Sequence, residues 1–165
     1  MKHIIIPTDF SIRSLQPVHA AMDRFEGESV RISLLHLLHM PVGIPDLFTR
    51  ASSALPADAI QSEFRNACEV LKNKYASRLV QLNTVIRYGS TAPFLRNLIE
   101  GMKADAVLVC DPIGLTVPTK ISVDMVPLLS KLEGRVIRAN RGTTVRVGEM
   151  SLSELLTEPA FVYTN

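Results

Sequence analysis

The chain has 165 residues, of which 47% are hydrophobic and 21% are charged, so it is long and apolar enough to form one domain with its own core. Its 18 basic and 16 acidic residues give a net charge of +2, which is too balanced to indicate a nucleic-acid-binding protein. Only Cys68 and Cys110 are present, and we expect both to be reduced and mostly buried rather than joined in a disulfide framework.

The N-terminal apolar run, Ile4 to Ile6, is much shorter than the apolar part of a signal peptide. No other run approaches the roughly 18 apolar residues that a membrane-spanning helix needs. We therefore expect a cytoplasmic protein without a membrane or nucleic-acid partner.

Predicted strands and helices alternate along most of the chain. Apolar runs predict strands, and apolar residues at a spacing of three or four predict helices. The expected strands are residues 3–7, 30–38, 82–88, 106–110 and 135–139. The expected helices cover residues 15–25, 60–75, a segment from an N-cap at Ser90 or Thr91 with Pro93 in its first turn, and a short segment near 128–132. Prolines, glycine and paired serines predict a long loop over residues 40–56.

This alternation predicts an α/β fold with one parallel sheet of five strands, sandwiched by helices that connect the strands through right-handed crossovers. We expect one domain over residues 1–139 and a C-terminal extension over residues 140–165. The extension contains a strand-like pattern at 143–147, a helix-like pattern at 151–156 and an apolar end at 161–163. Ligands of such sheets bind outside the carboxyl ends of the strands.

Four short segments are similar to those of the universal stress protein family, in the same order, over residues 2 to about 139. They are Ile4 to Ser11 (IIIPTDFS), Leu34 to Leu37 (LLHL), Gly89, and Ala104 to Val109 (ADAVLV). The resemblance implies the strand order 3-2-1-4-5, an adenine-nucleotide alpha hydrolase-like sheet. It also implies a homodimer that forms through an edge fifth strand, and we expect the extension to pack on its own sheet or on that of its partner.

The resemblance further implies an ATP site in members that bind the nucleotide. The turn with Pro7, Thr8 and Asp9 would approach the adenine or ribose, a main-chain group of Leu37 would contact the base, and a glycine motif after the fourth strand would hold phosphate. That motif reads Gly, two residues, Gly, nine residues, then Gly followed by Ser or Thr. Only its second glycine is present here, as Gly114; Asp111 stands at the first position and Asp124, followed by Met125, at the third.

The two substituted positions argue against phosphate binding. Glycine gives phosphate oxygens room beside the main chain, whereas a carboxylate at about 6 Å would repel a phosphate charge by roughly 3 kcal/mol at an effective dielectric near 20. We expect Asp124 to act instead as the N-cap of the last helix, taking the amide hydrogens that a phosphate would otherwise bind. Two alternatives stay open: Asp9 either contacts a ligand or only organises its turn, and Asp111 with Asp124 would bind a divalent cation if the loop folded back.

No residues suggest a catalytic apparatus: the sequence has no assignable Ser–His–Asp set, no Walker loop and no dinucleotide-binding glycine fingerprint. His36 and His39 are three residues apart on a strand and point to opposite faces, so we interpret them as core or loop residues. A basic cluster near the end of the chain favours a charge-protected sheet edge over a surface for nucleic acid or an acidic partner. It comprises Arg135, Arg138, Arg141 and Arg146.

The sequence therefore predicts a non-catalytic stress-response or regulatory module that acts through an unidentified protein partner. Its nucleotide crevice would be degenerate, without a bound cofactor, and either empty or used for a different small ligand. The first alternative is an ATP-binding universal stress protein with a remodelled phosphate loop and at most slow hydrolysis. The second is an unrelated ligand-binding protein that shares only the fold.

Overall fold

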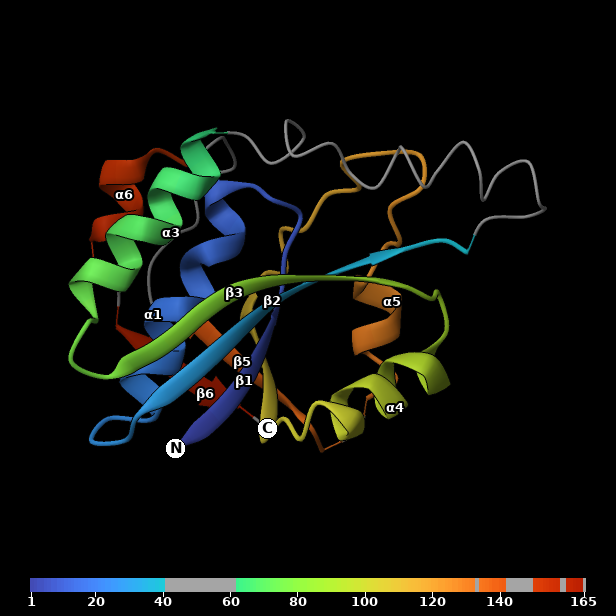
Figure 1. Ribbon diagram of the computed structural model, residues 1–165, viewed down its shortest axis with the longest axis horizontal. Helices are drawn as coiled ribbons and strands as arrows, with labels where there is room; N and C mark the ends of the chain where they lie inside the picture. The colour runs from blue at the N-terminus through green and yellow to red at the C-terminus, as the bar shows by residue number, and fades with distance from the viewer. Residues whose placement is uncertain (41–61, 133, 142–149, 158–159, 165) are drawn as a thin grey trace.

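The protein is described by a computed structural model that covers residues 1–40, 62–132, 134–141, 150–157 and 160–164 (Figure 1). The predicted long loop at 40–56 lies outside these residues except for its first position, and the predicted strand at 143–147 lies entirely outside them. Within them, the strands are β1 (Lys2–Pro7), β2 (Val30–Leu38), β3 (Leu79–Tyr88), β4 (Ala106–Asp111), β5 (Val136–Arg141) and β6 (Phe161–Thr164). The helices are η1 (Ile12–Leu15, a 3₁₀ helix), α1 (Gln16–Arg24), α3 (Ser62–Lys74), α4 (Ala92–Gly101), α5 (Val126–Leu129) and α6 (Leu152–Leu156).

The strands form one sheet in the order β3-β2-β1-β4-β5-β6. The first five strands are parallel and keep the expected order 3-2-1-4-5, with Ile4 of β1 beside Ile32 of β2 and Ala106 of β4. The expected five-stranded sheet is wrong in its strand number, because β6 adds a sixth strand antiparallel to β5. Helix α6 lies between β5 and β6 in the chain, and β6 runs back along β5 in the opposite direction.

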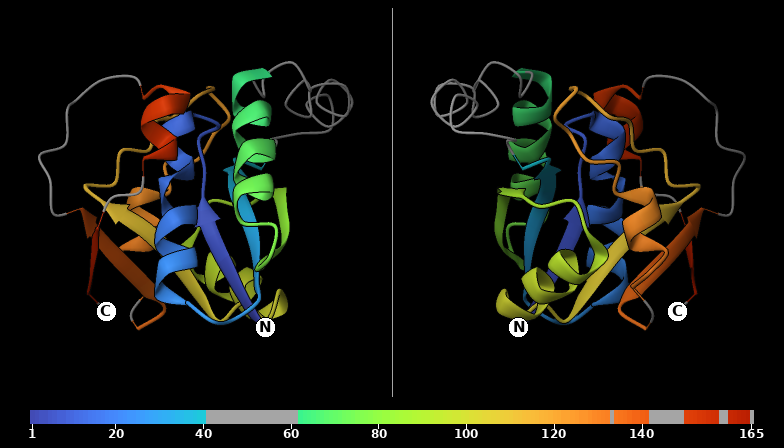
Figure 2. Two further views of the ribbon diagram at one scale, coloured as in Figure 1. Left: turned by 90° about the vertical axis from the view of Figure 1, so that its left-hand side faces the viewer. Right: turned by 90° about the vertical axis from the view of Figure 1, so that its right-hand side faces the viewer.

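Helices cover both faces of the sheet (Figures 1 and 2). On one face, α1, α3 and α6 bury a core with Leu15, Phe64 and Leu155, and on the other, α4 and α5 bury a core with Ile99 and Leu129. The central strands β1 and β2 are almost wholly buried. Their mostly apolar sequences follow from this position, since a strand covered on both faces has no solvent side on which polar residues would alternate.

Local sequence signals explain several helix ends. The Thr91 side chain caps α4 by accepting a hydrogen bond from the Phe94 amide, as expected for one of the two candidate caps. Ser151 and Glu154 form a reciprocal capping box at the start of α6. At α5, the expected N-cap is wrong: Met125 occupies that position without a side-chain cap, and Asp124 lies one residue before it.

The C-terminal segment packs on the chain's own sheet. Residues Phe161–Thr164 pair with Arg138–Arg141 of β5, and the Tyr163 hydroxyl donates to the main-chain oxygen of Ala20 in α1 at 3.0 Å. Strand β5 therefore has a neighbour on each side and is not the charged sheet edge expected from its arginines. Its Arg138 instead pairs with Asp111 of β4, and nearby Arg135 pairs with Glu100 of α4.

Candidate functional site

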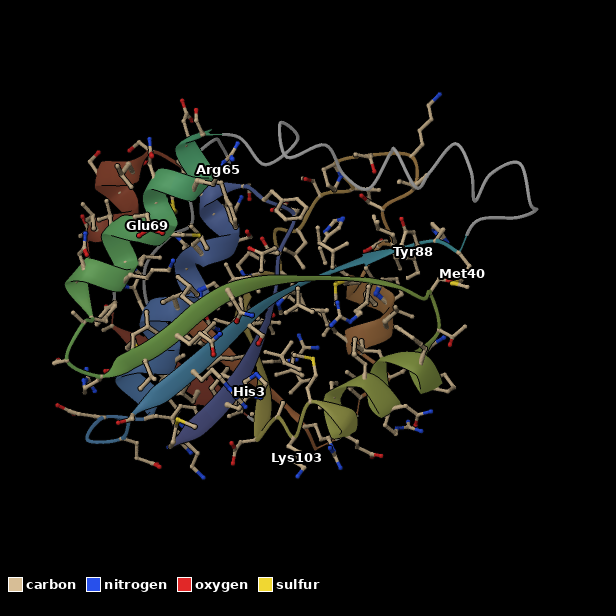
Figure 3. All side chains as sticks on the ribbon, viewed as in Figure 1. His3, Met40, Arg65, Glu69, Tyr88 and Lys103 are labelled. Carbon is tan, nitrogen blue, oxygen red and sulfur yellow. The ribbon has the colours of Figure 1, made fainter. Side chains whose placement is uncertain are left out.

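The carboxyl ends of β1 and β2 are where the sequence placed the candidate site. In Figure 3, Met40 lies just beyond the end of β2 and Tyr88 is the last residue of β3, whereas His3 of β1 lies toward the opposite end of the sheet. After β1, the chain turns through Thr8 and Asp9 into η1. Both side chains are buried, with 2% and 5% of their surface exposed, so their polar groups need partners inside the protein.

Asp9 has these partners. One carboxylate oxygen accepts from the amide and hydroxyl of Ser11, at 3.0 and 2.6 Å, and the other accepts from the amide and hydroxyl of Thr116, both at 2.8 Å. Burial alone would raise the pKa of Asp9, but these hydrogen bonds favour the ionised form and bring the pKa below its usual value. The carboxylate thus joins the turn after β1 to the loop after β4. These hydrogen bonds are those expected if Asp9 organises its turn, and they also reach a second loop.

Thr8 connects the same turn to β2 and η1. Its hydroxyl oxygen lies 2.7 Å from the Ser14 hydroxyl and accepts from the Phe10 amide at 3.0 Å. Phe10 has a φ of +64°, a conformation that few residues other than glycine adopt. Its buried ring packs against the rings of His36 and Phe64, with centroid distances of 4.6 and 5.7 Å. This packing and the hydrogen bond to Thr8 hold the turn in its unusual conformation.

The loop after β4 also contacts the end of β2. The Val123 amide donates to the Leu37 main-chain oxygen at 2.9 Å, and the His39 amide donates to that of Ile121 at 2.8 Å. Between them, Leu38 and Ser122 form an isolated antiparallel bridge. The carbonyl of Leu37, the residue that the resemblance assigns to base recognition, is therefore hydrogen-bonded within the chain.

A third contact joins this loop to His36. Because the Thr8 carbonyl at 2.7 Å only accepts, the proton lies on His36 Nδ1, and Nε2 accepts from the Ser122 hydroxyl at 2.9 Å. Burial lowers the pKa of His36 below its usual value, which favours the neutral ring. A serine hydroxyl hydrogen-bonded to a histidine is also the arrangement of a nucleophile and its base. Here, however, Ser122 and His36 are buried, with 3% and 2% of their surface exposed, and a carbonyl rather than a carboxylate orients the ring. We interpret this pair as a structural link.

The two aspartates of the altered glycine motif also have partners. Asp111 pairs with Arg138 at 3.1 Å, with about a third of each side chain exposed. Asp124 is exposed and accepts from the Val126 amide at 3.0 Å, so it takes an amide hydrogen at the start of α5 although Met125 is the N-cap. Among the described residues, no group of three or more His, Cys, Asp and Glu side chains is arranged to hold a metal ion.

Pro7 and Gly114 line a different feature, a small cavity at the ends of β1 and β4. The structure therefore divides the predicted site. Asp9 and Leu37 are hydrogen-bonded to the loop after β4, and Thr8 is hydrogen-bonded within its own turn and to His36. Pro7 and Gly114 face a cavity that the other predicted residues do not line. Sequence reasoning missed the partners Thr116 and Ser122. Serine and threonine are common in loops, and no local pattern marks these two.

Other features bear on the excluded classes of function. Both cysteines are partly buried thiols that form no disulfide, and burial raises the pKa of Cys68 to about 11. No helix in the part of the chain that the structure describes is long and apolar enough to cross a membrane.

Comparisons with known proteins identify the fold. No protein-family model matches the sequence, and no curated protein matches it significantly. The hypothetical protein PH0823 aligns with a TM-score of 0.54 at 19% identity, over 87% of this chain and 99% of its own. The hypothetical protein MJ0577 aligns with a TM-score of 0.53 at 16% identity, over 87% of this chain and 98% of its own. UspA, a universal stress protein from Lactobacillus plantarum, aligns with a TM-score of 0.54 at 18% identity, over 83% of this chain and 96% of its own. The chain thus has the universal stress protein fold, as the resemblance predicted.

Proposed function

We propose that the chain is a divergent universal stress protein that acts as a non-catalytic stress-response or regulatory module, with a nucleotide crevice closed by its own residues. One observation carries the closure: the loop after β4 supplies Thr116, Ser122 and Val123 as hydrogen-bonding partners for Asp9, His36 and Leu37. A nucleotide that used Asp9 and the Leu37 carbonyl would have to break these bonds, and each buried group that lost its partner would cost about 1–3 kcal/mol.

The residues present do not fit an adenine nucleotide in the manner that the resemblance implies. Asp9 already accepts four hydrogen bonds. The exposed Asp124 carboxylate accepts an amide hydrogen at the start of α5, and it adds negative charge where the family motif has glycine. The retained turn from Pro7 to Ser11 is explained by its internal hydrogen bonds without a ligand.

A ligand titration separates this proposal from an ATP-binding function. We expect ATP, ADP and AMP, each with and without Mg²⁺, to leave the melting temperature unchanged. A nucleotide at 100 times its dissociation constant would add about 2.7 kcal/mol, which raises the melting temperature of a chain of this size by roughly 5–10 °C. Such a shift would favour the alternative, an ATP-binding protein with a remodelled phosphate loop, and a phosphate-release assay would then test slow hydrolysis.

Two variants distinguish the causes of the closure. In Thr116→Val, one hydroxyl donor to Asp9 is lost while the shape of the side chain is kept; in Asp124→Gly, the exposed carboxylate is lost. If Asp124 blocks phosphate directly, isothermal titration should detect nucleotide binding to Asp124→Gly and none to the wild type. If Asp124→Gly gains no nucleotide affinity, this residue does not block phosphate directly. The internal hydrogen bonds then remain as the barrier, and Thr116→Val, which lacks one of them, tests that barrier.

We also propose that the protein is a homodimer and that a protein partner receives its signal. Because β5 is paired with β6 of the same chain, a dimer on this side of the sheet would be formed by β6, with Val162 exposed at 62%. Light scattering after size exclusion measures the mass directly. A monomer at high concentration would refute the dimer.

A further inference from the structure

The small cavity lined by Pro7 and Gly114 lies where the strand order of the sheet reverses. β1 and β4 are neighbours in the order β3-β2-β1-β4-β5, and chain connections leave their carboxyl ends toward opposite sides of the sheet. In open α/β sheets, this switch point is where ligands bind. The cavity has a volume of about 30 Å³, which exceeds the 10–15 Å³ that one water molecule requires, so it admits a small chemical group.

Arg13 of η1 is the cationic residue of the cavity wall. It is half-buried, and no hydrogen bond or ion pair joins its guanidinium to any residue that the structure describes. Other arginines near the sheet have such partners: Arg138 pairs with Asp111, and Arg78 donates to the main-chain oxygen of Met22 at 3.1 Å. A partly desolvated cation without an acceptor favours an anion from solution.

Gly114 allows the guanidinium to lie against the main chain after β4. A Cβ atom at this position would be 2.9 Å from both Cζ and Nε of Arg13, closer than real Cβ contacts, so any larger residue would displace the arginine. The glycine that survives from the family motif therefore has a role in this chain that its own structure explains. It keeps the cation at the cavity.

The other residues that line the cavity indicate which kind of anion fits it. Ser14 contributes a hydroxyl, but this group already lies 2.7 Å from the Thr8 hydroxyl and donates to the Ser11 main-chain oxygen at 2.8 Å. Gln16 also lines the cavity, and its side-chain amide donates to the Met150 sulfur at 3.0 Å. Most other lining residues are apolar, namely Pro17, Val109, Pro112, Ile113 and Leu115. One planar cation beside apolar walls matches a carboxylate on a short apolar body, since the guanidinium fork binds a carboxylate through two parallel hydrogen bonds. A triphosphate would need several donors.

We propose that this cavity binds the carboxylate of a small apolar acid through Arg13. The charged end of the ligand enters the cavity, and its apolar part contacts the residues after β4. This site does not depend on the proposed function, because it uses neither Asp9 nor the Leu37 carbonyl. A nucleotide titration and an acid titration therefore fail or succeed separately.

The test is a titration of the full chain with isobutyrate, followed by ¹H–¹⁵N NMR, which detects weak binding and locates it. We expect saturable shifts of amides at residues 13–16 and 113–115. Isobutyramide has the same shape without the charge and should produce no saturable shift. Equal shifts with the amide, no saturable shift with isobutyrate, or tighter binding of inorganic phosphate to the same amides would overturn the proposal.

Variants assign the binding to the arginine. Arg13→Gln should raise the dissociation constant for isobutyrate at least about tenfold, the cost of a charge-assisted hydrogen bond. Gly114→Ala should weaken binding several-fold because its methyl group displaces the guanidinium. Arg96→Gln, on the exposed side of α4, is the matched control and should bind as the wild type. The NMR spectra also show whether each variant is folded. Unchanged affinity in folded Arg13→Gln would refute the assignment.

Discussion

Replacing Asp9 with asparagine tests the link between the two loops. The substitution keeps the size and shape of the side chain but exchanges one acceptor oxygen for an amide group that donates. Each carboxylate oxygen faces one main-chain amide and one hydroxyl, from Ser11 or from Thr116. A hydroxyl can rotate and become an acceptor, whereas a main-chain amide cannot. At least one amide hydrogen would therefore lose its acceptor.

The cost follows from these contacts. One unsatisfied buried amide costs about 1–3 kcal/mol, and the remaining hydrogen bonds lose the assistance of the charge, so we expect Asp9→Asn to lower the free energy of unfolding by about 3 kcal/mol. For a chain of this size, that lowers the melting temperature by roughly 6–12 °C. Asp124→Asn is the matched control: its carboxylate is exposed with one hydrogen bond, and its unfolding midpoint should hardly change.

The pH dependence gives a second criterion. Because the pKa of Asp9 is below its usual value in the folded protein, its contribution to stability is complete above the unfolded pKa of about 3.9 and is lost as the pH falls through the folded pKa. Urea unfolding at pH 7 and near pH 3 should therefore show a difference between wild type and Asp9→Asn that narrows in acid. A variant as stable as Asp124→Asn at pH 7 would refute the assigned hydrogen bonds.

Three further predictions concern other parts of the fold. At Gly89, where φ is +157°, a Cβ atom would overlap the Phe94 ring, so Gly89→Ala should lower the free energy of unfolding by about 1–3 kcal/mol. Adding Phe94→Leu should recover the part of this loss that is due to the overlap, and no recovery in urea unfolding would contradict the overlap. Because burial lowers the pKa of His36, the unfolded state binds more protons, and wild-type stability should decline as the pH falls below about 6.5. Calorimetry should show a shallower decline in His36→Gln, and an identical decline would exclude His36 as its cause. A chain that ends at residue 159 lacks β6 and exposes the outer edge of β5. Light scattering should therefore detect assemblies larger than the dimer proposed for the full chain, and a mass no greater than that of a dimer would show that β6 does not protect this edge.

The sequence by itself determined the parallel part of the sheet. The apolar run from Ile4 to Ile6 and the mostly apolar run from Val30 to Leu38 predicted buried strands, because a strand covered on both faces has no solvent side. Thr91 and Pro93 predicted the start of α4 from local capping chemistry. The strand order came from the resemblance to universal stress proteins, and the structure bears it out.

Only the tertiary structure shows which hydrogen-bond partners the candidate-site residues have. The partners of Asp9 and His36, Thr116 and Ser122, are 107 and 86 positions away in the sequence. The sequence leaves both roles of Asp9 open, because a carboxylate that binds a ligand and one that joins two loops are the same residue in the same local pattern. The sixth strand is also a tertiary outcome, since the short apolar end of the chain becomes a strand only by pairing with β5. Local patterns specify which segments are buried, and long-range hydrogen bonds specify which polar groups remain available.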